Sequence, residues 1–196
     1  MRVIHYLDTL VGIGGTEVIL LDLYRNAKNE CLDVTVAGQG TLVKEYVKFN
    51  PRRFIECRRL LPIDLRIIFI LRRTIRQKNI GVIHVHNAVA AVHAYIASLF
   101  AGTKIVFSHH NFDSLDNFKD RLVRPYLTRR VHANVYSCRG LMEYYRQKYH
   151  LLNINLVISG KVDFKRLKIA ERSDLKKELN VGADSILLGM VGNFHT

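Results

Sequence analysis

The sequence predicts an α/β protein built on a doubly wound, mostly parallel, Rossmann-like sheet. Three observations lead to this fold class. Short β-branched or aromatic runs alternate with helical patterns along the chain, the runs are of the kind found in buried parallel strands, and a glycine-rich turn joins the first run to the first helix. The 196 residues, 48% of them hydrophobic, suffice for one domain, or for one domain and part of another.

Seven strands are expected, and most of them are followed by a helix. An alanine-rich helix is expected at Ala88–Ala101, and another at Asn117–Val131, with a kink or break at Pro125. The strands are expected at residues 2–7, 33–38, 53–57, 81–85, 104–108, 133–137 and 154–158. Ligands of such sheets bind beyond the carboxyl ends of the strands.

The turn after the first strand, Gly12–Glu17, is the first candidate binding element. Gly14 and Gly15 would let an anion or sugar approach backbone N–H groups at the positive end of a helix; the simpler alternative is that they only make a tight turn. The turn lacks the dinucleotide fingerprint, because Glu17 stands where G-x-G-x-x-G needs glycine and no acidic residue ends the second strand. We therefore expect a phosphate or sugar site of another kind.

Polar residues follow three later strands. His86 and Asn87 end the fourth, His110 the fifth and Ser137 the sixth, and all should meet the glycine turn at one open rim. His84 is expected to point into the core. Five histidines lie between residues 84 and 110, but they belong to two strand ends rather than to a compact ligand motif, so no metal is expected. No G-x-S-x-G elbow supports a serine hydrolase.

The formal net charge of +13 is concentrated between Pro51 and Lys78, where nine basic residues face two acidic ones. Helical spacing places Arg66, Arg73 and Arg76 away from the apolar face. They form either the solvated outer face of a packed helix or a surface for anionic lipids or polyphosphorylated substrates. Nucleic acid is not expected, because no stacking aromatic residues are interleaved with the basic stretches.

Cysteine usage and hydropathy point to a cytoplasmic protein. Three widely spaced cysteines argue against a disulfide framework, and His5 and Asp8 interrupt the N-terminal apolar run before it reaches signal-peptide length. Residues 80–103 carry no Asp, Glu, Lys or Arg, but their histidines, asparagine and glycines favour a strand, loop and helix over a membrane span.

These motifs together resemble the N-terminal half of a GT-B glycosyltransferase of family 4, the group 1 type. Gly14–Glu17 matches the family's G-G-x-E loop, and His84, His86 and Asn87 match its H-x-H-N segment. Ser108 and His110 match its T-x-H strand end, and Ser137 its serine after the next strand. The resemblance covers essentially the whole chain in order and spacing.

The resemblance implies that residues 1–168 form the acceptor-side domain and residues 169–196 the start of a truncated donor-nucleotide domain. Ser159–Asp163 keeps the Val-Asp of the family's N-G-V-D, Arg172–Leu179 resembles the connecting helix, and Ile186–Gly192 resembles the first strand of the second domain. On this interpretation the chain is a fragment that is inactive alone.

The complete enzyme implied by the resemblance transfers a sugar from a nucleotide-sugar to a glycan or lipid-linked hydroxyl, with retention and without a cofactor. His110 would be catalytic, Gly14 and Gly15 would contact the donor, and His86, Asn87 and Ser137 would line or support the acceptor side. In simpler roles His110 would cap its strand and Ser137 would cap the next helix. Location at the inner face of the membrane would suit the arginines. The alternative function is a non-catalytic module that binds an anionic ligand at the glycine turn.

Overall fold

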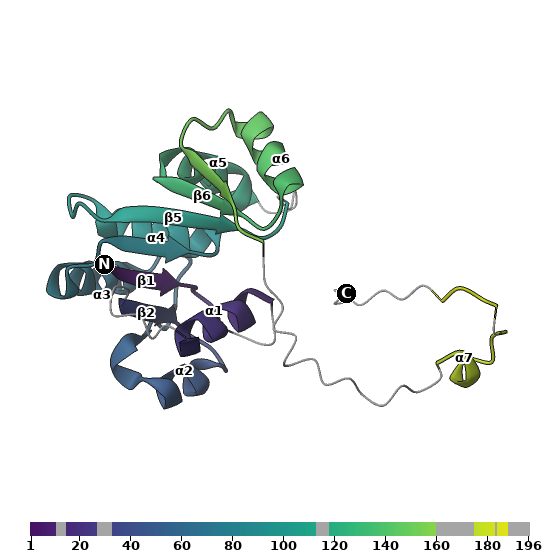
Figure 1. Cartoon of the computed structure of the whole chain (residues 1–196). Helices are drawn as coiled ribbons and strands as arrows, with labels where there is room; N and C mark the ends of the chain where they lie inside the picture. The colour runs from purple at the N-terminus through teal and green to yellow at the C-terminus, as the bar shows by residue number, and fades with distance from the viewer. Residues whose placement is uncertain (11–14, 27–32, 113–117, 160–174, 183, 188–196) are drawn as a thin grey trace. The chain divides into compact units, whose positions relative to one another are not determined.

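The computed structural model describes residues 1–10, 15–26, 33–112, 118–159, 175–182 and 184–187 (Figure 1). The chain divides into two compact units, residues 1–160 and residues 161–196. The first unit holds the whole described sheet.

The first unit is built on a seven-stranded sheet in which every neighbouring pair is parallel, with strand order β3-β2-β1-β4-β5-β6-β7 (Figure 1). All seven expected strands are present, and each end lies within one residue of its prediction. The strands are β1 (Arg2–Tyr6), β2 (Asp33–Gly38), β3 (Phe54–Glu56), β4 (Val82–Val85), β5 (Lys104–His109), β6 (Ala133–Tyr136) and β7 (Ile154–Val157).

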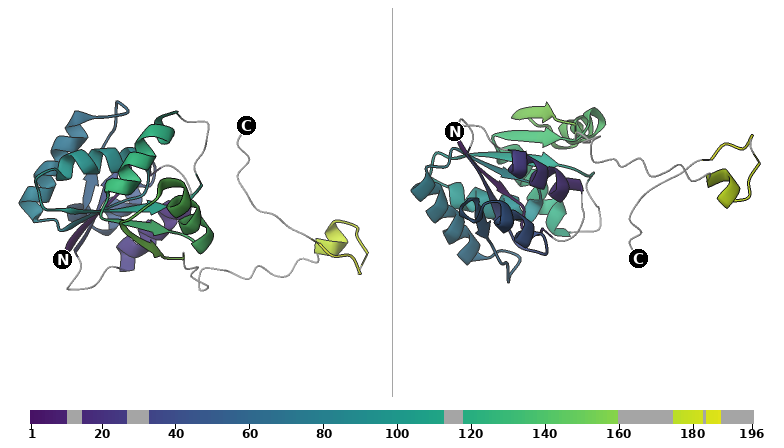
Figure 2. Two further views of the ribbon diagram at one scale, coloured as in Figure 1. Left: turned by 90° about the horizontal axis from the view of Figure 1, so that it is seen from above. Right: turned by 60° about the horizontal axis from the view of Figure 1, so that its bottom comes forward.

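Helices lie on both faces of the sheet, which confirms the doubly wound prediction (Figures 1 and 2). The main core lies between the sheet and α3 (Leu65–Lys78), α4 (Ala88–Ser98) and α5 (Phe118–Arg130). A second core on the other face includes side chains of α1 (Gly15–Asn26) and α2 (Val43–Phe49). A short 3₁₀ turn, Pro51–Arg53, precedes β3, and α6 (Arg139–Tyr149) packs its tyrosines on Tyr136.

Local sequence features account for the ends of α3 and for the close packing of α4. Asp64 caps α3, with its carboxylate accepting from the backbone N–H of Arg66 at 3.1 Å, and Asn79 ends that helix in the left-handed conformation, with φ of 50°. The alanines of α4 are all buried, which lets the helix lie close to the strands. The helix α5 continues through Pro125 rather than breaking there.

The uncharged stretch 80–103 contains β4 and α4, as expected, and not a membrane span. Among the described residues, every helix is too short or too polar to cross a bilayer.

Less of the second unit is described. It contains α7 (Leu175–Glu178), which lies within the predicted connecting helix. Ile186 and Leu187 belong to no strand, and the rest of the predicted strand Ile186–Val191 lies outside the described residues. The predicted domain boundary at residue 168 also lies outside them and stays a prediction.

Candidate functional site

The candidate site lies on three adjacent strands, at and beyond their carboxyl ends. His5 of β1 is the register partner of His84 of β4, and His84 is the partner of Val106 of β5. Because alternate residues of a strand share a face, His86, Ser108 and His110 lie on the same face as His5 and His84. This is the face that carries α1 and α2.

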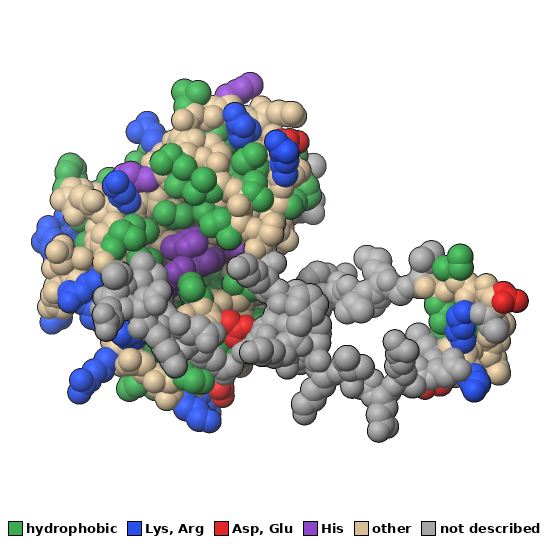
Figure 3. All heavy atoms as spheres, in the orientation of Figure 1, with side chains coloured by type: hydrophobic (Ala, Val, Ile, Leu, Met, Phe, Trp, Pro, Cys, Tyr) green, Lys and Arg blue, Asp and Glu red, His purple; other side chains and the backbone are tan. Residues whose placement is uncertain are grey.

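The histidines of this face contact one another and form what is called here the histidine cluster: His5, His84, His86 and His110. Nδ1 of His5 lies 3.2 Å from Nε2 of His86, and Nδ1 of His86 lies 3.5 Å from Nε2 of His110. Nε2 of His84 lies 2.7 Å from Oγ of Ser108, and the His84 and His86 rings stack with centroids 4.5 Å apart. Histidine side chains gather at one place on this side of the molecule, beside hydrophobic side chains (Figure 3).

The contacts couple the proton positions of three rings. A neutral imidazole donates from one nitrogen and accepts at the other. If Nε2 of His86 donates to His5, then Nδ1 of His86 accepts from His110; if His5 donates instead, both bonds reverse. A group that binds His110 and fixes its proton therefore also selects the tautomer of the two rings behind it.

Burial keeps the cluster neutral at pH 7. Loss of water contact lowers the pKa of His5 to about 4 and, together with smaller effects of His5 and His110, that of His84 to about 3. The same cause lowers the pKa of His86 well below its usual value and also lowers that of His110. His110 can thus exchange hydrogen bonds with a sugar hydroxyl or ester oxygen, but it presents no fixed positive charge.

Asn87 supports the site from the start of α4. Its Oδ1 accepts from the backbone N–H of Ala90 at 2.8 Å as the helix cap, and its Nδ2 donates to the carboxylate of Asp8. Asp8 is buried and also pairs with Arg59, 3.3 Å away. The side chain of Asn87 thus fixes the segment after β1 against α4.

The glycine turn is described only from Gly15 onward, and Gly14 lies outside the described residues. Gly15 is the first residue of α1, and a Cβ placed on it would meet no atom within 4 Å. The space beside Gly15 is therefore open, as close approach of a ligand to the helix start requires.

Ser137 follows β6, which is the neighbour of β5, and it is half-buried. Because Tyr136 is the register partner of His109, Ser137 and His110 are the next residues on adjacent strands. The simpler role considered for Ser137, as a helix cap, is wrong, since Cys138 occupies the cap position of α6.

The structure corrects the placement of His84. It is half-buried in the histidine cluster and not in the core, because residues 84 and 86 are two apart on a strand and must share a face. The other histidines of the 84–110 stretch lie elsewhere. His93 hydrogen-bonds Tyr6 Oη and the backbone N–H of Asp64, and His109 hydrogen-bonds Asn134 Oδ1.

The sequence interpretation missed His5 and Asp8 as members of the site. The sequence does contain a signal. His5 lies inside an otherwise apolar strand and Asp8 follows that strand closely, and polar residues are uncommon at such buried positions. Their burial, at 6% and 4% exposed, confirms that both are held by partners inside the fold.

Of the three arginines predicted to form a basic surface on α3, one is held in an ion pair and two are exposed. Arg66 forms a two-point ion pair with Asp64, through Nε at 3.0 Å and Nη2 at 2.5 Å, which holds the pKa of that carboxyl well below its usual range. Arg73 and Arg76 are exposed on the outer face of the helix.

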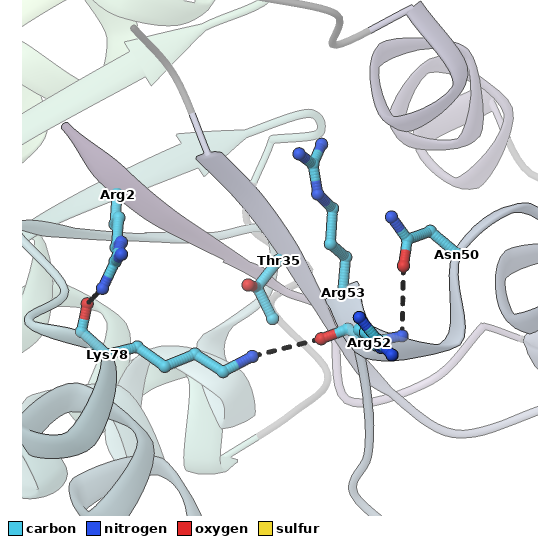
Figure 4. Close-up of a pocket in the computed structure, with 6 residues that line it drawn as sticks. All are labelled: Arg2, Thr35, Asn50, Arg52, Arg53 and Lys78. Carbon is cyan, nitrogen blue, oxygen red and sulfur yellow. Dashed lines mark hydrogen bonds between the residues drawn. The ribbon is translucent and has the colours of Figure 1, made fainter. Parts of the chain in front are cut away.

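A hollow of about 320 Å³ lies at the opposite, amino edge of the sheet (Figure 4). It is basic, and its cations are oriented by backbone carbonyls: Arg2 donates to Lys78 O at 2.7 Å and Lys78 donates to Arg52 O at 3.2 Å. Its lining consists of Arg2, Thr35, Asn50, Arg52, Arg53 and Lys78. Arg2 is the first residue of β1, whereas the histidine cluster lies toward the carboxyl ends of the strands. This hollow is therefore separate from the candidate site.

Comparison with known proteins gives one family. Residues 13–158 match the family described as Glycosyltransferase Family 4. No functionally curated protein matches the chain.

Solved structures with the same fold include a glycosyltransferase from Rickettsia africae ESF-5, with 14% identity and a TM-score of 0.68, covering 93% of this chain and 50% of that one. Anabaena Alr3699/HepE in complex with UDP has 17% identity and a TM-score of 0.68, covering 92% and 50%. UDP-GlcNAc 2-epimerase from Methanocaldococcus jannaschii has 11% identity and a TM-score of 0.60, covering 81% and 45%. The chain spans about half the length of the solved structures that it matches.

Proposed function

Because the chain belongs to Glycosyltransferase Family 4, we propose that it forms the acceptor-side half of an enzyme that transfers a sugar from a nucleotide-sugar to a glycan or lipid-linked hydroxyl, with retention. One observation carries the proposal. His86 and Asn87 directly follow β4 and His110 directly follows β5, at the carboxyl edge of the sheet; His86 contacts His110, and Asn87 bonds Asp8 just after β1. The nucleotide would be bound chiefly by a second domain.

His110 is proposed as the catalytic residue, acting as a neutral hydrogen-bonding group on the donor sugar or on its leaving oxygen. Its Nε2 faces His86, so Nδ1 is the nitrogen available to a substrate. His86 and Asn87 are proposed as supports, since their polar atoms already hold His5, His110, Ala90 and Asp8. Ser137, beside His110, is proposed to line the acceptor side.

The test of this role is the His110→Ala variant of the complete enzyme. We expect turnover to fall about a hundredfold, the size typical of removing one donor that acts in the transition state, with the melting temperature nearly unchanged. The matched control is His150→Asn, which removes an exposed histidine after α6 at a left-handed position that Asn tolerates and should leave turnover intact. Unchanged turnover in His110→Ala would contradict the catalytic assignment.

The donor role of the glycine turn is tested at Gly15. The open space around it means that Gly15→Val leaves the fold intact, so a loss of affinity for the nucleotide-sugar would report a clash with the ligand itself. Calorimetric titration of the complete enzyme measures this affinity. Equal donor affinity in the wild type and in Gly15→Val would remove the turn from the donor site.

We further propose that α3 and the segment before it bind an anionic membrane surface. Large apolar side chains are exposed there: the exposed fraction is 61% for Leu61, 65% for Leu65 and 69% for Phe69. Arg73 and Arg76 follow Phe69 at four and seven residues and so share its side of the helix. An apolar stripe beside arginines is the composition of an interfacial helix. This surface would bring a lipid-linked acceptor to the site.

A further inference from the structure

Three histidines of the cluster meet closely enough to hold one ion. One ring nitrogen from each of His5, His84 and His86 lies within 4.8 Å of the others. His5 belongs to β1 and His84 to β4, and the register of these strands sets His5 directly opposite His84. His5 and His84 therefore lie on two hydrogen-bonded strands in the middle of the sheet, and His86 directly follows the second of them.

The spacing agrees with ligation of a small metal ion. Two nitrogens that bind one Zn²⁺ in tetrahedral geometry at about 2.0–2.1 Å are about 3.3 Å apart. Nδ1 of His5 and Nε2 of His86 are separated by 3.2 Å. One ring nitrogen of His84 lies within 4.8 Å of these two nitrogens.

The surroundings supply the outer contacts that ligand histidines normally have. Ser108 Oγ is 2.7 Å from Nε2 of His84, and Nε2 of His110 is 3.5 Å from Nδ1 of His86. Such contacts to the outer ring nitrogen fix the orientation of a ligand ring. His5 is buried while His84 and His86 are half-buried, so a bound ion would keep one side open to water or substrate.

We propose that His5, His84 and His86 form a binding site for a Zn²⁺-like transition-metal ion, with a fourth position open at the surface. Three imidazole nitrogens without a carboxylate suit Zn²⁺, Co²⁺ or Ni²⁺ and not Mg²⁺ or Ca²⁺, which prefer oxygen. The sequence predicts no metal because the histidines between residues 84 and 110 belong to two strand ends. His5 is 79 residues from His84 along the chain, and the fold brings them together. The proposal does not depend on sugar transfer.

The test is titration of residues 1–196 with Co²⁺, whose visible absorption distinguishes four-coordinate from six-coordinate ions. We expect an intense four-coordinate spectrum that saturates at one Co²⁺ per chain and disappears when Zn²⁺ displaces it. His5→Asn and His86→Gln, which keep side-chain shape at the contacting nitrogen, should each weaken binding by more than about a hundredfold. This exceeds the ~10- to 100-fold cost of losing an outer-shell partner.

Two further variants define the site. Ser108→Ala removes only the outer contact of His84 and should weaken binding about tenfold. His150→Asn changes an exposed histidine elsewhere, in a left-handed position that Asn tolerates, and should bind as the wild type does. Circular dichroism checks that each variant is folded.

Absence of a four-coordinate Co²⁺ spectrum in the wild type would overturn the proposal, as would its persistence in folded His5→Asn. If the variants do not fold, ¹H–¹⁵N spectra of the wild-type histidine rings decide. Zn²⁺ must then shift the rings of His5, His84 and His86, and a shift confined to other histidines would overturn the proposal.

Discussion

Gly38, the last residue of β2, lies against the segment that follows β1. A Cβ at this position would stand 2.4 Å from the carbonyl oxygen of Leu7 and 2.9 Å from Cδ1 of Leu10. Because the closest atom belongs to the backbone, the clash cannot be relieved by a side-chain rotation. We expect Gly38→Ala to lower the free energy of unfolding by about 1–3 kcal/mol, measured by urea denaturation.

The control for this prediction is Gly140→Ala. Gly140 is the second residue of α6, and a Cβ there would meet no atom within 4 Å. Alanine in an unobstructed helix should leave stability unchanged or raise it by about 0.5–1 kcal/mol. Equal losses in the two variants would show that the close approach at Gly38 is not the cause.

The histidine cluster makes stability depend on pH. Burial lowers the pKa of His5 from 6.5 to about 4, so below pH 6.5 the unfolded chain takes up a proton that the folded chain refuses. The free energy of unfolding should therefore fall as the pH falls from 6.5 toward 4, by about 2 kcal/mol at pH 5 from His5 alone. His84, His86 and His110 act in the same direction.

Urea denaturation between pH 7 and pH 4.5, with a chelator present, measures this dependence. His5→Asn, which cannot take up the proton, should show a shallower fall than the wild type. A stability that stays constant over this range would mean that the cluster is charged in the folded protein as well.

At the scale of an element, the start of α4 depends on one side chain with two partners. Asn87→Ala removes both the cap on Ala90 and the hydrogen bond to Asp8, and we expect it to cost about 2 kcal/mol of unfolding free energy. Asn87→Ser keeps a capping oxygen and loses only the bond to Asp8, so it should cost about half as much. Thermal unfolding that treats the two variants alike would refute this division.

The outer face of α3 is tested with vesicles. Arg73→Gln combined with Arg76→Gln should weaken sedimentation with phosphatidylglycerol vesicles about thirtyfold, since each basic residue near an anionic surface contributes about 1 kcal/mol. Arg139→Gln combined with Arg146→Gln makes the same charge change on α6 and should have little effect. Equal loss in both pairs would indicate attraction by net charge alone and no surface on α3.

At the scale of the whole molecule, residues 1–160 contain every strand of the described sheet and all of the buried clusters. We therefore expect residues 1–160 expressed alone to fold in one cooperative transition, with a melting temperature within a few degrees of that of residues 1–196. Calorimetry of the two chains measures this. Loss of the transition on truncation would show that the second unit is needed for the first to fold.

Local sequence patterns were enough to predict the fold class, the strands and the edge of the sheet where polar groups gather. The reason is that the alternation of strands and helices, the helical spacing of apolar residues and the residues after each strand are local properties of the sequence. Seven strand patterns along the chain all indicate the same parallel sheet. The placement of His110 and His86 together followed from β4 and β5 being parallel neighbours, which a doubly wound order already implies.

Contacts between side chains distant in the sequence could be identified from the folded structure alone. It placed His5 against His86, turned His84 out of the core and gave the carboxylate of Asp8 to both Asn87 and Arg59. These pairs join residues far apart in the sequence, and they depend on the register between β1 and β4. Packing of the two cores against the sheet fixes that register, and no local pattern of residues encodes it.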